Sequence, residues 1–218
     1  MNFFDAFSWV NLRFLFEGLR VTVEVSLLSI VFSFLIGGLA GVIRFSKVPF
    51  LSRIIGIIID VIRNLPLLLI IFFTYFALPQ IGISFDIFWS AVVALTIFES
   101  AMLSEIFRAG LNAVPKGQME AGLSTGLSYL ESMRTIVLPQ AFKSMIPAIL
   151  SQLISLIKDT SLAVIISLPE LTHNAKIIYG QNEQYVLPMF LAMTIAYFAV
   201  CYLLSLVSRY LETKQYNY

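Results

Sequence analysis

The stretch that decides the fold reads PKGQMEAGLSTGLSYLESMRTIVLP and covers residues 115–139. It is polar and rich in helix-forming residues, and it lies between long apolar runs. Gly126 stands near its centre and can adopt a left-handed conformation, which ends one helix and lets another begin. The stretch therefore predicts two short helices at an angle, which would form a rigid knob.

The composition of the whole chain is typical of a membrane protein. Of the 218 residues, 59% are hydrophobic and 12% are charged, and the mean hydropathy is +0.89. A soluble domain carries about 25% charged residues, so the main solvent of this chain is lipid. One Cys excludes a disulfide framework and a CxxC metal site, and one His leaves no zinc cluster. A net charge of +1 excludes a nucleic-acid footprint.

Five stretches are long and apolar enough to span a membrane, because a span needs about 20 mostly apolar residues. They lie near residues 19–43, 51–78, 88–107, 146–168 and 185–206. We therefore expect an all-α membrane protein with five transmembrane helices. Its expected segments are an N-terminal interfacial segment at 1–18, a transmembrane domain at 19–211 with a cytoplasmic loop at 109–145, and a cytoplasmic tail at 212–218.

The basic residues predict the orientation of these spans. Lys and Arg are frequent in the connections at 44–53 and 108–145, and the connection at 79–87 has none. Cytoplasmic connections carry the excess of Lys and Arg. The knob and the C-terminus are therefore expected in the cytoplasm, and the N-terminus outside.

With the spans placed, residues 115–139 resemble the EAA loop of permease subunits in ABC importers, whose pattern is E-A-A-x3-G-x9-I-x-L-P. Every spacing matches, and the one departure is Gly122, where the family has a second Ala. An ordinary amphipathic loop is the alternative, but six residue types at fixed offsets favour the EAA loop. The matching and neighbouring residues expected to couple to an ATPase are Pro115, Gly117, Glu120, Ala121, Gly122, Gly126, Leu138 and Pro139.

The resemblance extends over roughly residues 21–218. SEIFRAG at 104–110, VPKGQ at 114–118 and IKDTSL at 157–162 are similar to runs in the polar amino acid branch of these permeases. RNLPLL at 63–68 is similar to its R-G-T-P-L-L, with Asn64 and Leu65 in place of Gly and Thr. The resemblance implies a MetI-like permease fold and an importer of the histidine, glutamine, glutamate or arginine type.

The resemblance also implies partners. This chain lacks the G-x-x-x-x-G-K-[ST] phosphate loop, so ATP and Mg would be bound by separate ATP-binding subunits, and this chain would hold no cofactor and be no enzyme itself. A solute-binding protein would deliver the amino acid from outside. A second permease subunit would complete the pathway in the lipid bilayer of a bacterial cytoplasmic membrane, with no nucleic acid involved.

Charged residues inside the spans suggest a substrate site. Arg63, Glu99 and Lys158 each lie about 16–18 Å along a span, near the middle of a core of ~30 Å. Charges at that depth cost ~2.5–3.5 kcal/mol and usually face a protein interior or cavity. The candidate substrate contacts are Arg63, Asn64, Pro66, Glu99, Ser100, Lys158, Asp159, Thr160 and Ser161.

The chemistry of these residues suits a zwitterion. A carboxylate and two hydroxyls at 159–161 suit an α-ammonium group, and Arg63 or Lys158 would suit an α-carboxylate. The structural alternative is that Arg63 pairs with Asp60 one turn back, that Lys158 pairs with an acid on another helix, and that Pro66 is a plain kink.

Two other classes of membrane protein compete with the importer. An ion-coupled secondary transporter would use the carboxylates for a proton or cation, but the sequence has no inverted repeat and its five spans do not halve. A scaffolding protein would not need charges at mid-depth. The sequence leaves open which amino acid is moved, and whether the permease pairs with itself or with a different subunit.

Overall fold

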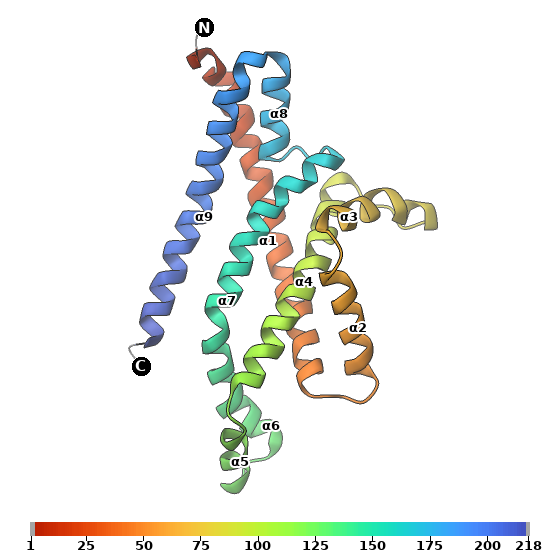
Figure 1. The fold of residues 1–218 in the computed structure, drawn as a ribbon, viewed down its shortest axis with the longest axis vertical. Coiled ribbons are helices and arrows are strands. Elements are labelled where there is room, and N and C mark those ends of the chain that lie inside the picture. The colour runs from red at the N-terminus through yellow and green to blue at the C-terminus, as the bar shows by residue number, and fades with distance from the viewer. Residues whose placement is uncertain (1–2, 217–218) are drawn as a thin grey trace.

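The computed structural model describes residues 3–216, and the side chains of residues 5–210. Within 3–216 every regular element is helical (Figure 1). The α-helices are α1 (Trp9–Phe45), α2 (Leu51–Arg63), α3 (Leu67–Phe72), α4 (Ile87–Ala113), α5 (Lys116–Ser124), α6 (Tyr129–Ser132), α7 (Leu138–Asp159), α8 (Leu171–Gln181) and α9 (Val186–Tyr216). Short 3-10 or π segments are η1 (Phe3–Phe7), η2 (Phe73–Ala77), η3 (Leu78–Ile81), η4 (Met133–Val137), η5 (Thr160–Ile166) and η6 (Glu183–Tyr185).

The number of spans agrees with the expected five. Four helices are long and apolar enough to cross a membrane, and the bent pair formed by residues 51–63 and 67–81 is a fifth span when counted as one. The N-terminal end of the chain and the α5–α6 segment lie at opposite ends of the molecule, as Figure 1 shows. The C-terminal end of α9 points toward the α5–α6 end.

Helix α1 is longer than the first expected span. The hydroxyl of Ser8 accepts a hydrogen bond from the backbone N–H of Asn11 and caps the helix start. The helix then continues without a break to Phe45, so the boundary expected at residue 18 does not coincide with a helix end. Its 37 residues give a length of about 55 Å, which exceeds a hydrocarbon core of ~30 Å.

A stripe of small residues lets α1 pack closely on α4. A Cβ atom at Gly37 would lie 2.7 Å from the carbonyl oxygen of Ser100, and one at Gly41 would lie 2.6 Å from the Cβ of Phe107. Small residues allow such close backbone approach between membrane helices. The small-residue stripe, buried and spaced three or four residues apart, comprises Thr22, Ser26, Ser29, Ser33, Gly37 and Gly41.

The second span is not the straight helix we expected. Helices α2 and α3 meet at an angle of 103°, because Pro66 has an extended backbone (φ −61°, ψ 131°) and starts α3 without continuing α2. Of the residues in α2 only Ile59 is buried. An apolar cavity of about 220 Å³ lies between α1, α2 and α4, so α2 packs loosely against the rest of the molecule.

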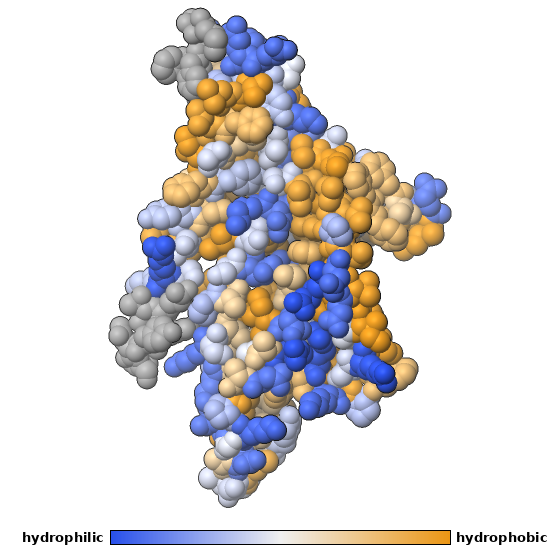
Figure 2. All heavy atoms as spheres, viewed as in Figure 1, coloured by the Kyte–Doolittle hydropathy of each residue, from blue (hydrophilic) through white to orange (hydrophobic). Residues whose placement is uncertain are grey.

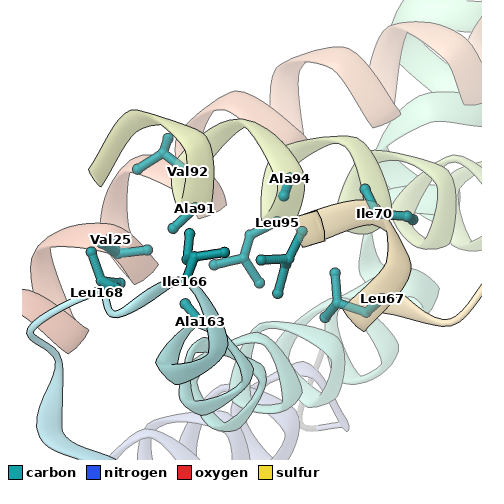
Figure 3. Close-up of a cluster of buried hydrophobic side chains, with 11 residues drawn as sticks. Val25, Leu67, Ile70, Ala91, Val92, Ala94, Leu95, Ala163, Ile166 and Leu168 are labelled. Carbon is teal, nitrogen blue, oxygen red and sulfur yellow. The ribbon is translucent and has the colours of Figure 1, made fainter. Parts of the chain in front are cut away.

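The main apolar core joins elements from across the sequence. Figure 3 shows Val25 of α1, Leu67 and Ile70 of α3, Leu95 of α4 and Ile166 of η5 pointing toward one another. The same cluster contains Ala91, Val92, Ala94, Ala163 and Leu168. This core fixes the start of α3 and the end of the fourth span relative to α4.

A second core lies at the end of the molecule that carries the N-terminus. Leu15 of α1, Leu171 and Ile178 of α8, and Met189 and Met193 of α9 pack together there. The N–H of Leu171 donates to the hydroxyl of Thr22, and the amide of Asn174 donates to the carbonyl oxygen of Phe14. Helix α8 is therefore fixed against α1 and α9. The apolar pattern of the sequence does not distinguish α8 from the connection between the last two spans.

Candidate functional site

The knob has the two-helix form expected from its sequence. Pro115 precedes α5, and Gly126 follows its end with φ +91°. The N–H of Gly126 donates to the carbonyl oxygen of Leu123 at 3.1 Å, and that of Leu127 donates to the carbonyl oxygen of Gly122 at 3.2 Å. The chain then starts α6, so Gly126 forms the left-handed turn between the two helices.

The start of α6 is held by a reciprocal cap. The Ser128 hydroxyl accepts from the N–H of Glu131, and the Glu131 carboxylate accepts from the N–H of Ser128. Such a capping box satisfies two helix-end donors at once. The turn and the cap are both formed by residues of the knob itself.

Gly122, the departure from the family pattern, has a packing reason. It is buried, and a Cβ atom there would lie 2.6 Å from the Oγ of Ser132 and 2.9 Å from the Cδ1 of Ile136. Glycine at this position therefore lets α5 approach α6 and η4 closely. The close packing of α5 on α6 and η4 offsets the lower helix propensity of glycine relative to alanine.

The outer surface of the knob is available for contact with another protein. Glu120, Ala121, Gly117 and Pro139 are exposed, and Leu138 is half-buried. Large apolar side chains that the sequence analysis did not single out are also exposed here: Leu130 is 74% exposed, Tyr129 53% and Leu123 45%. An exposed apolar tip at the end of α5 and α6 is typical of a protein-binding surface. In Figure 2 this end of the molecule shows a mixture of hydrophilic and apolar side chains.

The mid-depth charges divide into two groups. The first group lies between α4 and α7. Glu99 is buried, with 1% of its surface exposed, and its Oε2 accepts a hydrogen bond from the Nε2 of Gln152 at 3.2 Å. Asp159, half-buried at the end of α7, is close enough to act electrostatically on Glu99. The hydroxyl of Ser100, next to Glu99, is also buried.

Gln152 is a site residue that the sequence analysis missed. Its side chain links α7 to α4 over a sequence separation of 53 residues. The available signal was its position seven residues before Asp159, which places both residues on one face of α7.

The hydroxyls of the next two candidate residues, Thr160 and Ser161, bond to backbone carbonyl oxygens of the preceding turn. The hydroxyl of Thr160 donates to the carbonyl oxygen of Ile157, and that of Ser161 donates to the carbonyl oxygen of Lys158. Lys158 itself is exposed and lies near Cys201 of α9. The expected ion pair between Lys158 and an acid on another helix is not among the salt bridges of residues 5–210.

The second group of charges gathers around Glu105 of α4. Its Oε2 lies 2.8 Å from Arg44 of α1 and 3.8 Å from Arg63 of α2, and its Oε1 pairs with Arg108 one turn further on. Asp60 lies 3.9 Å from Arg44. One carboxylate thus joins arginines from three helices, and Figure 2 shows hydrophilic side chains between α2 and α4.

Arg63 pairs across to α4 and belongs to this second group of charges, not to the group around Glu99. The bend at Pro66 leaves Arg63 at the end of α2, directed toward Glu105, and the expected pairing of Arg63 with Asp60 is absent from the salt bridges of the described residues. Glu105 is six residues after Glu99, about 9 Å along α4. Asn64 is exposed and its amide donates to the carbonyl oxygen of Asp60, and Pro66 is exposed at the bend.

The chain combines membrane-spanning helices, a two-helix knob with exposed apolar side chains at one end, and buried polar side chains between two spans, a combination typical of a transport permease. The chain belongs to the family of binding-protein-dependent transport system inner membrane components, whose model matches residues 33–215. It is an ABC transporter permease, and the family resemblance expected from its motifs is confirmed.

Known proteins similar to this chain support the same family. It is 56% identical over 217 residues to the probable glutamine ABC transporter permease protein GlnP of Bacillus subtilis, covering 99% of this chain and 100% of the relative. A solved amino acid ABC transporter with histidines matches with a TM-score of 0.86 at 30% identity, covering 93% of this chain and 94% of that one. The inward-facing MetNI methionine ABC transporter matches in fold, with a TM-score of 0.77 at 20% identity over 94% of this chain and 99% of that one.

Proposed function

We propose that this permease imports polar or charged amino acids across a bacterial cytoplasmic membrane, driven by ATP that separate subunits hydrolyse. The observation that carries the proposal is the knob at 115–139, because it presents exposed apolar and polar residues to a partner at one end of the bundle. The similarity to a glutamine permease and to an amino acid transporter supports the substrate class.

The proposed partners follow from the family and from the knob. ATP-binding subunits, which hold ATP and Mg, contact the knob at Pro115, Gly117, Glu120, Ala121, Gly126, Leu138 and Pro139, together with the exposed tip at Leu123, Tyr129 and Leu130. Gly122 is buried and supports this surface by letting α5 pack on α6 and η4. A solute-binding protein delivers substrate at the opposite end. A second permease subunit completes the pathway. The N-terminus lies outside and the C-terminus in the cytoplasm, as the basic connections favour.

The proposed substrate site centres on the group between α4 and α7. Glu99, Ser100 and Asp159 form its polar surface, with Lys158 at the end of α7 and Thr160 and Ser161 at the start of η5. Arg63, Asn64 and Pro66 lie at the bend of the second span and face the substrate on its way toward the cytoplasm.

The proposed function is tested with the whole transporter in proteoliposomes, together with its ATP-binding and solute-binding partners. We expect uptake of radiolabelled L-glutamine that requires ATP and needs no ion gradient. Uptake driven by an ion gradient in the absence of ATP would instead identify an ion-coupled secondary transporter. A wild-type complex that accumulates none of L-glutamine, L-arginine and L-glutamate would contradict the amino acid assignment.

Asp159→Asn tests the substrate site separately from the fold. An unneeded carboxylate at this depth would be too costly to keep. We therefore expect a rise in the KM for uptake of about tenfold, with little change in the melting temperature of the detergent-solubilised complex. A lower melting temperature with unaltered KM would make Asp159 a structural partner of Lys158.

A further inference from the structure

Glu99 has an unusual environment for a buried carboxylate. One oxygen, Oε2, accepts the hydrogen bond from Gln152, and the other, Oε1, is fully buried and has no hydrogen-bond partner among the described residues. The hydroxyl oxygens of Thr96 and Ser100, one turn or less away on α4, are likewise buried without a partner within that part of the chain. A buried carboxyl oxygen without a hydrogen-bond partner costs free energy, and a ligand that donates to Oε1 would remove this cost.

The charged groups around Glu99 show what kind of donor is needed. Asp159 is the charged group that acts on Glu99 from α7. Arg63 is directed toward Glu105, and Lys158 is exposed near Cys201. Among residues 5–210 no Lys, Arg or His forms a salt bridge with Glu99. Lys158, the neighbour of Asp159 in the sequence, acts electrostatically on Asp159, whereas Glu99 has no cation paired with it. A positively charged donor therefore complements Glu99.

We infer that Gln152 is a positioning residue for the substrate: its amide holds Oε2 of Glu99, so that Oε1 is left free to accept the ammonium group of an amino acid. This inference rests on the proposed function. An amide donates a hydrogen bond without adding charge, so it orients Glu99 without neutralising it. A Lys or Arg at the same position would orient Glu99 and neutralise it at once.

The arrangement also names the class of amino acid. Gln152 and Asp159 lie on one face of α7, seven residues apart, and Glu99 faces them from α4. A ligand in this site meets two carboxylates and one amide. Amino acids with neutral or cationic side chains fit this set, and a second carboxylate in the side chain of glutamate or aspartate is repelled. L-glutamine and L-arginine are therefore expected to be taken up at lower KM than L-glutamate.

The test uses the complete transporter in proteoliposomes, with radiolabelled L-glutamine as the probe. Gln152→Met keeps the length of the side chain and removes the donor, and Gln152→Glu keeps its shape and turns the donor into an acceptor that repels Glu99. We expect the KM to rise about tenfold in Gln152→Met, which corresponds to about 1.4 kcal/mol, and to rise further in Gln152→Glu. The kcat is expected to stay within about twofold in Gln152→Met.

Two controls separate the inference from the proposed function. Ser151→Ala changes the exposed neighbour of Gln152 on α7 and should leave KM unchanged. Glu99→Gln removes the charge itself and should raise KM at least as much as Gln152→Met. If Glu99→Gln raises KM and Gln152→Met does not, the positioning role is overturned and the substrate site stands. If Glu99→Gln has no effect on KM, the proposed substrate site is overturned. A lower melting temperature of Gln152→Met with an unaltered KM also overturns the inference, because Gln152 then only joins two helices.

Discussion

Two glycines of the knob show how single residues determine its shape in different ways. Gly126 is required by its backbone, because φ +91° is strained for any residue with a Cβ atom. Gly122 is required by its neighbours, because Ser132 and Ile136 occupy the space that a side chain would need. A variant at the first position changes the turn, and a variant at the second changes the distance between α5 and α6.

We expect Gly126→Asp to leave the permease in the membrane and to abolish uptake. A Cβ atom at positive φ costs ~1–2 kcal/mol, and the new charge lies on the surface proposed to contact the ATP-binding subunit. The measurement is co-purification of that subunit with the variant, together with uptake in proteoliposomes.

Gly180→Ala is the control, since a Cβ atom at this exposed position of α8, outside the knob, meets nothing within 4 Å and φ is not positive. It should retain both co-purification and uptake. Normal recovery of the ATP-binding subunit and normal uptake in Gly126→Asp would contradict the role of the turn.

The residues also show what the sequence could predict. The turn at Gly126 depends on neighbours within a few positions, so its residue pattern was sufficient. The hydrogen bond from Gln152 to Glu99 depends on how α7 packs on α4, over 53 residues, and no local pattern specifies that distance. The angle of 103° between α2 and α3 likewise depends on tertiary packing, because Pro66 predicts a kink and not its angle.

At the level of elements, α1 and α4 illustrate how membrane helices associate without a hydrophobic driving force between them. Their backbones approach at Gly37 and Gly41, against the carbonyl oxygens of Ser100 and Ser104. Van der Waals contact over this length replaces the hydrophobic effect that would join helices in water. The contact is sensitive to single atoms, because a Cβ has no space at either position.

Gly41→Ala and Gly38→Ala form a matched pair of variants on neighbouring turns of α1. A Cβ atom at Gly41 would lie 2.6 Å from the Cβ of Phe107 and 2.8 Å from a backbone oxygen, and one at Gly38 would lie 3.5 Å from the ring of Phe107. We expect Gly41→Ala to destabilise the permease by about 1–3 kcal/mol, and Gly38→Ala to have little effect. Melting temperatures of the solubilised complex measure both, and equal melting temperatures would refute the close contact.

The attachment of α8 is expected to depend on pH through Glu170. Burial raises the pKa of Glu170 above its ordinary value of 4.5, although the N–H groups of Thr172 and His173 and the hydroxyl of Tyr197 donate to its carboxylate. The unfolded chain therefore releases this proton at lower pH than the folded chain does. The stability is highest below the unfolded pKa, falls as the pH rises toward the folded pKa, and stays lower above it.

The measurement compares the melting temperature of the wild-type complex with that of Glu170→Gln at several pH values from 4 upward. We expect the wild type to lose stability relative to the variant as the pH rises. Burial and Lys176 lower the pKa of His173, which acts in the opposite direction, but His173 is present in both proteins and cancels in the difference. A difference that does not vary with pH would rule out a titrating Glu170.

For the molecule as a whole, the arrangement of its ends is the property that function requires. The knob lies at one end, and the second core with α8 lies at the other (Figure 1). The sequence predicted the number of spans from apolar length alone, because a bilayer imposes that length on any helix. It did not predict that α1 and α8 build a separate packed region at the N-terminal end, since that packing depends on contacts between distant segments.

Cysteine labelling in cells tests the orientation of the molecule. In a Cys201→Ser background, a single Cys replacing the exposed Ser84 should react with a membrane-impermeant reagent from outside, and one replacing Ser124 should react only after permeabilisation. The basis is the absence of Lys and Arg from 79–87 and their presence around the knob. The reverse labelling pattern would place the knob on the outer side and remove the proposed contact with the ATP-binding subunits.

The small-residue stripe of α1 has a consequence for how the protein is made. Ser29 of α1 is synthesised 63 residues before Val92 of α4, and its hydroxyl donates to the carbonyl oxygen of Val92 in the folded protein. At roughly 5–20 residues per second, this interval lasts about 3–13 s. During that time α1 faces lipid or an insertion factor with its polar stripe uncovered. The hydroxyls of Thr22, Ser26 and Ser33 donate to carbonyl oxygens of α1 itself, so most of the stripe satisfies its own hydrogen bonds while the nascent chain waits for its partner helix.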